Sequence, residues 1–162
     1  MATRGKDLSN YDPNNIPDAS ALRFGIVVSE WNSEITGALL QGALQTFTEN
    51  GLSKSSIIVR WVPGSFELAL GAQYLFEQHD VNAVVCLGSV VQGETKHFDF
   101  VCQSTAQGIM DVSLKFGRPA IFGVLTDNNM EQARARSGGI HGNKGVECAI
   151  AAIKMAVLKE QG

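Results

Sequence analysis

The sequence has few cysteines, little charge and no long apolar run. Its three cysteines, Cys86, Cys102 and Cys148, are odd in number and far apart, so neither a disulfide framework nor a zinc site is indicated. No apolar run reaches the length of a membrane span, and the first 20 residues are polar rather than signal-like. We therefore expect a cytoplasmic protein with no membrane partner.

The low charge of the chain also limits the functions that it can have. Charged residues make up 18% of the 162 residues and the net charge is −3, which argues against nucleic-acid binding because such proteins carry a clustered basic face. So little charge on a small domain indicates that much of its surface is buried against copies of itself. The 44% of hydrophobic residues are enough for a real core. We expect a polar, turn-rich arm over residues 1–21, without a core of its own, and a single domain over residues 22–162.

Apolar runs alternate with helical patterns along the domain. The expected strands cover residues 22–29, 57–62, 83–88 and 119–125. The expected helices start at a cap on Asn32 or Ser33, after Pro63-Gly64, near His97, near Met130, and after a glycine-rich break at 138–145. This alternation predicts an α/β fold, a three-layer sandwich whose flavodoxin-like parallel sheet of four strands has helices on both faces.

Residues 84–100 are the most informative segment. The apolar run that ends at Gly88 is typical of a buried strand, and a polar loop separates it from a helix that starts near His97. Open α/β sheets bind ligands at the carboxyl ends of their strands. The loop carries a hydroxyl, a carboxylate, an ammonium and an imidazole, so we expect an anionic, polar substrate, with His97 moving protons. The glycine spacing is similar to that of a nucleotide-binding loop, but Glu94 stands where that motif needs lysine.

Three motifs resemble those of the lumazine synthase family. They are VPGSFE at residues 62–67, GETKHFD at 93–99 and GNKG at 142–145, in the family's order and at compatible spacing. The resemblance covers about residues 24–158. It implies a transferase of riboflavin biosynthesis that uses no metal and no organic cofactor. Its two substrates are 5-amino-6-(D-ribitylamino)uracil and 3,4-dihydroxy-2-butanone 4-phosphate, and it releases phosphate and water.

The resemblance also assigns roles on the pyrimidine side of the site. It implies that Trp31 stacks on the pyrimidine ring and that Asn32 beside it also contacts the substrate. It implies further contacts to the ribityl chain and the pyrimidine edge from Ser65, Phe66, Glu67, Ser89, Val90 and Val91, and a pocket-completing Phe122 from an adjacent subunit. The residues by themselves leave other interpretations open. Trp31 and Phe122 could be core aromatics, and Ser65 and Glu67 could form a helix-start capping pair.

On the phosphate side the resemblance implies that Arg136 holds the phosphate and that His97 transfers protons. The backbone and hydroxyl of Gly93, Glu94 and Thr95 approach the phosphate at a helix start, and Lys144 and Glu147 form a pair nearby. Without the resemblance, Arg136 is a solvated helix charge like Arg134, and Lys144 with Glu147 is a surface ion pair.

Two positions depart from the family pattern. Many relatives have a small residue where Glu94 stands, so we expect its carboxylate to point to solvent or to pair with a base. Relatives often have lysine before the small residue at the position of His141, whereas this chain has Ile140. One basic group is therefore missing from the glycine-rich break.

The resemblance implies a homo-oligomer with active sites between adjacent subunits. The expected assembly is a pentamer or an icosahedral shell of twelve pentamers, in which the arm adds a strand to a neighbour's sheet, and it associates with riboflavin synthase. The alternatives are a non-catalytic flavin- or pterin-binding module, a shell-forming protein without activity, and an archaeal-type riboflavin synthase. The joint presence of His97, Arg136 and Lys144 favours the enzyme.

Overall fold

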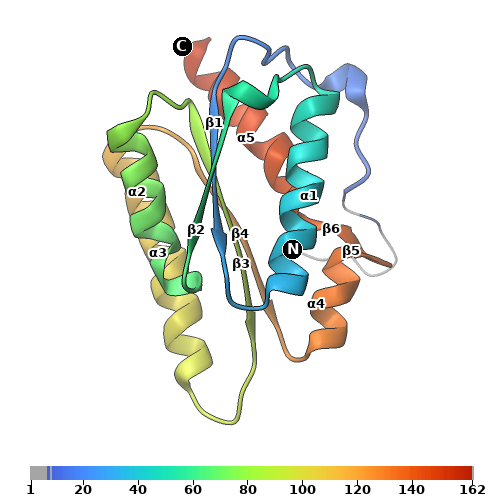
Figure 1. Cartoon of the computed structure of the whole chain (residues 1–162), viewed down its shortest axis with the longest axis vertical. Coiled ribbons are helices and arrows are strands. Elements are labelled where there is room, and N and C mark those ends of the chain that lie inside the picture. The colour runs from blue at the N-terminus through green and yellow to red at the C-terminus, as the bar shows by residue number, and fades with distance from the viewer. Residues whose placement is uncertain (1–6, 8, 162) are drawn as a thin grey trace.

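A four-stranded, all-parallel sheet forms the centre of the chain. The computed structural model describes residue 7 and residues 9–161. The strands are β1 (Phe24–Ser29), β2 (Ile57–Val62), β3 (Ala83–Val91) and β4 (Ala120–Asp127), in the spatial order β2-β1-β3-β4. Helices cover both faces of this sheet, which confirms the predicted three-layer α/β sandwich (Figure 1).

The helices divide into two layers. They are α1 (Ser33–Glu49), α2 (Leu68–Gln78), α3 (His97–Phe116), α4 (Met130–Arg136) and α5 (Lys144–Glu160). Helices α2 and α3 lie on one side of the sheet, and α1, α4 and α5 lie on the other (Figure 1). None of the described helices is long and apolar enough to cross a membrane.

Each helix layer closes its own hydrophobic core against the sheet. All six residues of β1 are buried, as expected for a parallel strand with both faces covered. On the α1–α5 side the rings of Phe24 and Phe47 stack with centroids 4.7 Å apart. Cys86 is fully buried on the α2–α3 side, and its burial raises the pKa of the thiol far above the usual range, so it is a packing residue.

Two predicted boundaries were wrong at the carboxyl ends of the strands. β3 continues three residues past Gly88, because Ser89, Val90 and Val91 pair with a β4 that is itself longer than predicted and ends at Asp127. This pairing satisfies backbone groups that a loop would leave to water. The helix after Gly64 starts as a 3₁₀ turn, η3 (Ser65–Glu67), before α2 begins.

The glycine-rich break between α4 and α5 is a small hairpin. β5 (Ser137–Gly139) and β6 (Gly142–Asn143) pair antiparallel, and α5 begins at the next residue. The hairpin therefore fixes the position of the C-terminal end of α4 relative to the N-terminal end of α5.

The described part of the arm packs on its own domain. The hydroxyl of Tyr11 donates to Glu49 Oε2 at 3.4 Å and accepts from Asn50 Nδ2 at 3.2 Å, both at the end of α1. Ile16 packs against the core of the α1–α5 side, and Ala19 is buried. Within its described residues the arm forms one 3₁₀ turn, Pro13–Asn15, and no strand. Its addition to a neighbour's sheet stays a prediction.

Candidate active site

The candidate site lies where the sheet order reverses direction. The chain leaves β1 toward β2 on one side and leaves β3 toward β4 on the other, so the carboxyl ends of β1 and β3 flank a crevice. A cavity of about 410 Å³ opens there. Its lining residues are Trp31, Gly64, Ser65, Phe66, Glu67, Ser89, Val90, Val91, Gly93, Thr95, His97, Phe98 and Val101. Ten of the sixteen residues assigned to the site from the sequence are among them.

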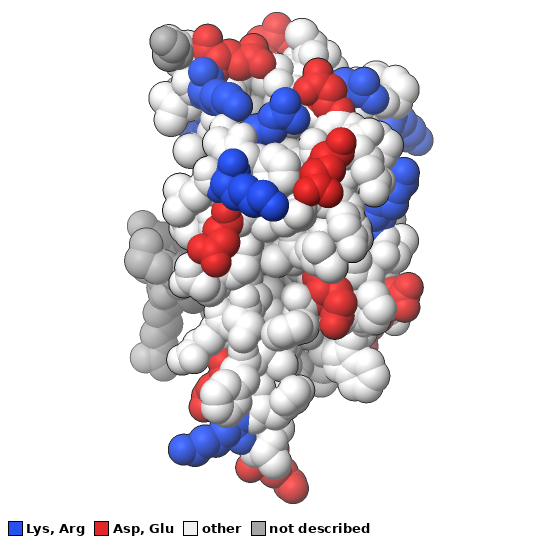
Figure 2. All heavy atoms as spheres, turned by 90° about the vertical axis from the view of Figure 1, so that its left-hand side faces the viewer, with Lys and Arg blue, Asp and Glu red and all other residues white. Residues whose placement is uncertain are grey.

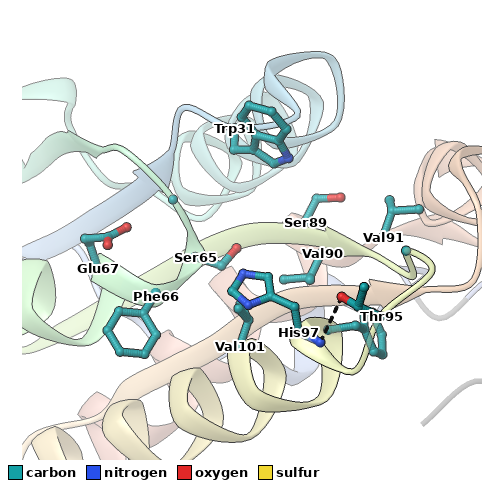
Figure 3. Close-up of a pocket in the computed structure, with 13 residues that line it drawn as sticks. Trp31, Ser65, Phe66, Glu67, Ser89, Val90, Val91, Thr95, His97 and Val101 are labelled. Atoms are coloured by element: carbon teal, nitrogen blue, oxygen red, sulfur yellow. Dashed lines mark hydrogen bonds between the residues drawn. The ribbon is translucent and has the colours of Figure 1, made fainter.

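Trp31 forms an aromatic wall of this cavity. It follows β1, and its backbone N–H donates to Pro63 O at 3.3 Å, which holds the turn against the segment after β2. Its side chain is 72% exposed, so the core-aromatic interpretation was wrong. Figure 3 shows the indole on the opposite side of the β3 strand end from His97. An exposed indole in this position can stack on a flat ring.

Asn32 occupies the N-cap position of α1, but its side chain bonds to β3 and not to the helix. Its backbone is left-handed, with φ 58°, a conformation that asparagine tolerates better than most residues. The side chain makes no capping bond to α1 and instead donates from Nδ2 to Ser89 O at 3.0 Å. Asn32 therefore marks the predicted start of α1 without making a side-chain cap, and it ties the start of α1 to the end of β3.

The η3 turn forms the floor of the cavity. Ser65 is buried, and its carbonyl accepts a hydrogen bond from Thr105 Oγ1 at 3.2 Å. A Cβ at position 88 would lie 2.5 Å from Ser65 Oγ, so Gly88 permits this close approach of η3 to β3. Neither Ser65 nor Glu67 makes a capping bond, so the predicted capping pair was wrong. The Glu67 carboxylate faces the cavity (Figure 3).

His97 is the first residue of α3, as the helical pattern predicts. Its backbone N–H donates to Thr95 Oγ1 at 3.4 Å, and its exposed imidazole lines the cavity (Figure 3). The helix contributes a partial positive charge at this end. Glu94, in the loop before it, is exposed and has no ion-pair partner within the part of the chain that the structure describes, so its predicted solvent orientation is confirmed.

A second group of charged side chains lies where α4, the hairpin and α5 meet. Glu147 Oε1 accepts from Arg136 Nη2 at 3.2 Å, and its Oε2 accepts from Lys144 Nζ at 2.9 Å. The exposed fractions of the Arg136, Lys144 and Glu147 side chains are 12%, 21% and 16%. The interpretations as a solvated charge and as a surface ion pair were therefore wrong, whereas Arg134 is 58% exposed and pairs with Glu34 at the surface.

Asp127 is a charged residue near this group that the sequence analysis missed. Burial raises the pKa of its carboxyl, and the charge of Arg136 opposes that rise. Its Oδ2 is inaccessible to solvent and has no hydrogen-bond partner among the described residues. The only signal in the sequence was an acidic residue near the end of a predicted strand, which is common in turns.

The cavity and the charged group are separate within one chain. Arg136, Lys144 and Glu147 do not line the cavity, and neither does Phe122, which is 37% exposed on the edge strand β4. The structure thus brings most residues assigned to the pyrimidine together with Gly93, Thr95 and His97 of the phosphate side, and it leaves Arg136, Lys144 and Glu147 on another part of the surface. Among the described residues no group of three or more histidine, cysteine, aspartate or glutamate side chains could hold a metal ion.

Comparison with known proteins identifies the family. The family model for 6,7-dimethyl-8-ribityllumazine synthase matches residues 21–160. The chain belongs to the 6,7-dimethyl-8-ribityllumazine synthase family. Proteins of that name are 59% identical in Christiangramia forsetii (99% of this chain, 96% of the relative) and 56% identical in Flavobacterium johnsoniae (99% and 85%). A third, from Phocaeicola vulgatus, is 50% identical (99% and 96%).

The resemblance drawn from three short motifs is therefore confirmed over nearly the whole chain. The structure separates the motifs that predicted the lumazine synthase family. Residues of the VPGSFE and GETKHFD motifs line the cavity, whereas Lys144 of the GNKG motif belongs to the charged group. Within one chain, the three motifs therefore do not meet in a single cavity.

Proposed function

We propose that this protein is the enzyme that makes 6,7-dimethyl-8-ribityllumazine. It condenses 5-amino-6-(D-ribitylamino)uracil with 3,4-dihydroxy-2-butanone 4-phosphate and releases phosphate and water. The observation that carries the proposal is the cavity at the switch point, where the Trp31 indole and the His97 imidazole lie on opposite sides of the β3 strand end. Membership of the family supplies the identity of the substrates.

The pyrimidine substrate would bind along the cavity wall. Its flat ring stacks on Trp31, and its polar edge meets the backbone of residues 89–91 at the end of β3. The ribityl chain runs toward η3, where Glu67 accepts hydrogen bonds from its hydroxyls. Such positioning lowers the entropic cost of bringing the two reactants together.

His97 would transfer protons during the condensation. The substrate amine attacks the ketone to form an imine and water leaves. The phosphate group is then eliminated, and the ribitylamino nitrogen attacks the tautomerised carbonyl, which closes the second ring with loss of a second water. The imidazole accepts the proton of the attacking amine and assists departure of phosphate. Gly93 and Thr95, at the positive end of α3, lie on the side of the cavity where the phosphate would bind.

We propose that an adjacent subunit completes the site with Phe122 and Arg136. The surface supports such an assembly, because large apolar side chains stay exposed on α2, η3 and α3: Phe66 (61%), Leu70 (48%), Tyr74 (48%) and Phe100 (66%). Figure 2 shows that this side of the molecule carries most of its charges at one end and a smaller group at the other, with mainly uncharged side chains and a few acidic ones between them. Monomers seldom expose patches of this kind. Pentamer or shell, association with riboflavin synthase and a cytoplasmic location stay predictions.

A turnover assay tests the proposed activity. The purified protein is mixed with both substrates, and the fluorescent lumazine is followed against an enzyme-free blank, because the reactants combine slowly unaided. We expect a clear acceleration. A folded, oligomeric sample with no acceleration would overturn the proposal in favour of a binding or shell protein.

The mass of the protein in solution tests the assembly. Light scattering after size-exclusion chromatography should give a multiple of the 17.4 kDa chain mass. A monomer at micromolar concentration would contradict a site completed by a neighbour.

A further inference from the structure

Asn143 connects three elements at the edge of the charged group. Its side-chain Oδ1 accepts from Gly145 N at 2.8 Å, so it caps the start of α5. Its Nδ2 donates to Ala38 O of α1 at 2.9 Å. Its backbone lies in β6, opposite Ser137 of β5. One side chain therefore holds α5 onto α1, while its backbone pairs with the hairpin strand that follows Arg136.

The contacts around Asn143 leave it little freedom. A Cβ at position 42 of α1 would lie 2.6 Å from the Asn143 carboxamide, and a Cβ at position 145 would overlap Leu39 O. Gly42 and Gly145 thus let α1 and α5 come close enough for the side chain to bridge them. At this separation a carboxamide both caps one helix and reaches the backbone of the other.

The charged residues flank Asn143 on both sides. Arg136 immediately precedes its β5 partner Ser137, Lys144 is the next residue, and Glu147 lies in the first turn of α5. Arg136 Nη1 also donates to His141 O at 3.4 Å, and His141 N donates to Ala135 O at 2.9 Å, so the hairpin itself is hydrogen-bonded to the end of α4. A shift of the α5 start would therefore move Lys144 and Glu147 relative to Arg136.

We propose that Asn143 is a positioning residue for phosphate recognition, which it serves by fixing the geometry of Arg136, Lys144 and Glu147. The inference rests on the proposed function and extends it to a residue that touches no substrate. Arginine recognises phosphate through a planar fork, so its orientation decides how many hydrogen bonds form. Asn143 thus keeps Lys144 and Glu147 in a fixed position relative to Arg136 before the ketone phosphate binds.

Substitution of Asn143 by serine tests the proposal. Serine still caps α5 but is too short to reach Ala38 O, and it adds no charge beside the phosphate. We expect Asn143→Ser to raise KM for the butanone phosphate about tenfold, the equivalent of one weakened hydrogen bond to a charged group. KM for the pyrimidine substrate should stay within about twofold, because the cavity does not include this residue.

Asn82→Ser is the matched control. Asn82 also bridges two segments, at the opposite end of the sheet, where it accepts from Arg23 N at 2.9 Å and donates to the Glu160 side chain (Oε1) at 3.0 Å. Its substitution should lower stability without changing either KM. An unchanged KM for the ketone phosphate in Asn143→Ser, or an equal rise in Asn82→Ser, would overturn the positioning role. A wild-type protein without turnover would instead overturn the proposed function.

Discussion

At the scale of single residues, neighbours in the sequence have different environments. Arg134 and Arg136 lie on the same short helix, yet Arg134 is exposed beside Glu34 whereas Arg136 is largely buried on Glu147. Trp31 shows the reverse, because an aromatic residue next to a buried strand is mostly exposed. Residue type alone does not determine whether these side chains are buried, since burial depends on which other segments pack against each one.

His97→Ala should reduce kcat by roughly one to three orders of magnitude, because a general acid–base group is removed while the substrate contacts remain. His79→Ala, at the C-terminal end of α2, is the matched control and should leave kcat unchanged. Steady-state kinetics on both substrates measure the effect. Equal activity of the two variants would remove His97 from the chemistry.

Arg136→Ala should raise KM for the butanone phosphate by about 10- to 100-fold, the loss of hydrogen bonds between a cation and an anion. The KM of the pyrimidine substrate should change little. Arg134→Ala removes the same charge two residues away and should have no such effect, since Arg134 pairs with Glu34 at the surface. Unchanged ketone-phosphate kinetics in Arg136→Ala would show that phosphate binds elsewhere.

Asp127 should make stability depend on pH in a defined direction. Burial raises the pKa of Asp127 in the folded state, so the unfolded state releases the proton more readily and the stability due to this group falls as pH rises through the folded pKa. Asp127→Asn should therefore gain stability relative to wild type as the pH rises above the ordinary carboxyl pKa of about 4. Urea unfolding across this range measures the difference.

Glu34→Gln should change the pH dependence of stability in the opposite direction from Asp127→Asn. Its hydrogen bond with Arg134 lowers the pKa of Glu34, so the stabilisation is present above the unfolded pKa and is lost as pH falls through the folded one. The variant should be the less stable form near neutral pH, and the two proteins should converge in acid. Parallel pH profiles for both variants would contradict the assignment at Asp127.

At the scale of elements, helical and strand periodicity predicted the type and order of nearly every segment. β2 matches its prediction over residues 57–62, and α3 begins at His97. The errors lie at ends, where tertiary contacts decide. β3 is longer because β4 pairs with it, and Asn32, the N-cap residue of α1, makes no side-chain cap because its side chain bonds to Ser89 O.

Gly145→Ala should destabilise the fold by about 1–3 kcal/mol, because a methyl group there would overlap Leu39 O of α1. Gly37→Ala is a control on a neighbouring helix. No atom lies within 4 Å of a Cβ at Gly37, so alanine should stabilise α1 by up to about 1 kcal/mol. Urea titration reports both changes, and a neutral Gly145→Ala would mean that α1 and α5 can move apart freely.

At the scale of the whole molecule, the separation of the cavity from Arg136 predicts complementation between defective subunits. His97→Ala and Arg136→Ala, each weak alone, should regain activity when they are co-expressed. Random pairing of neighbours would restore about one quarter of the sites. Trp31→Ala with His97→Ala is the control, because both residues line the same cavity and no pairing repairs it. Activity no higher in the first mixture than in the control would place the complete site within one chain.

The sequence by itself determined the order of strands and helices, the parallel sheet and the family, because apolar periodicity is local and short motifs carry chemistry in a recognisable order. It also indicated a surface covered by other copies, through its low charge. Only the tertiary structure decided that ten of the assigned site residues share one cavity and that Arg136, Lys144 and Glu147 lie apart from it. That separation depends on which layer α4 and α5 join, and such a choice arises from packing between segments distant in sequence.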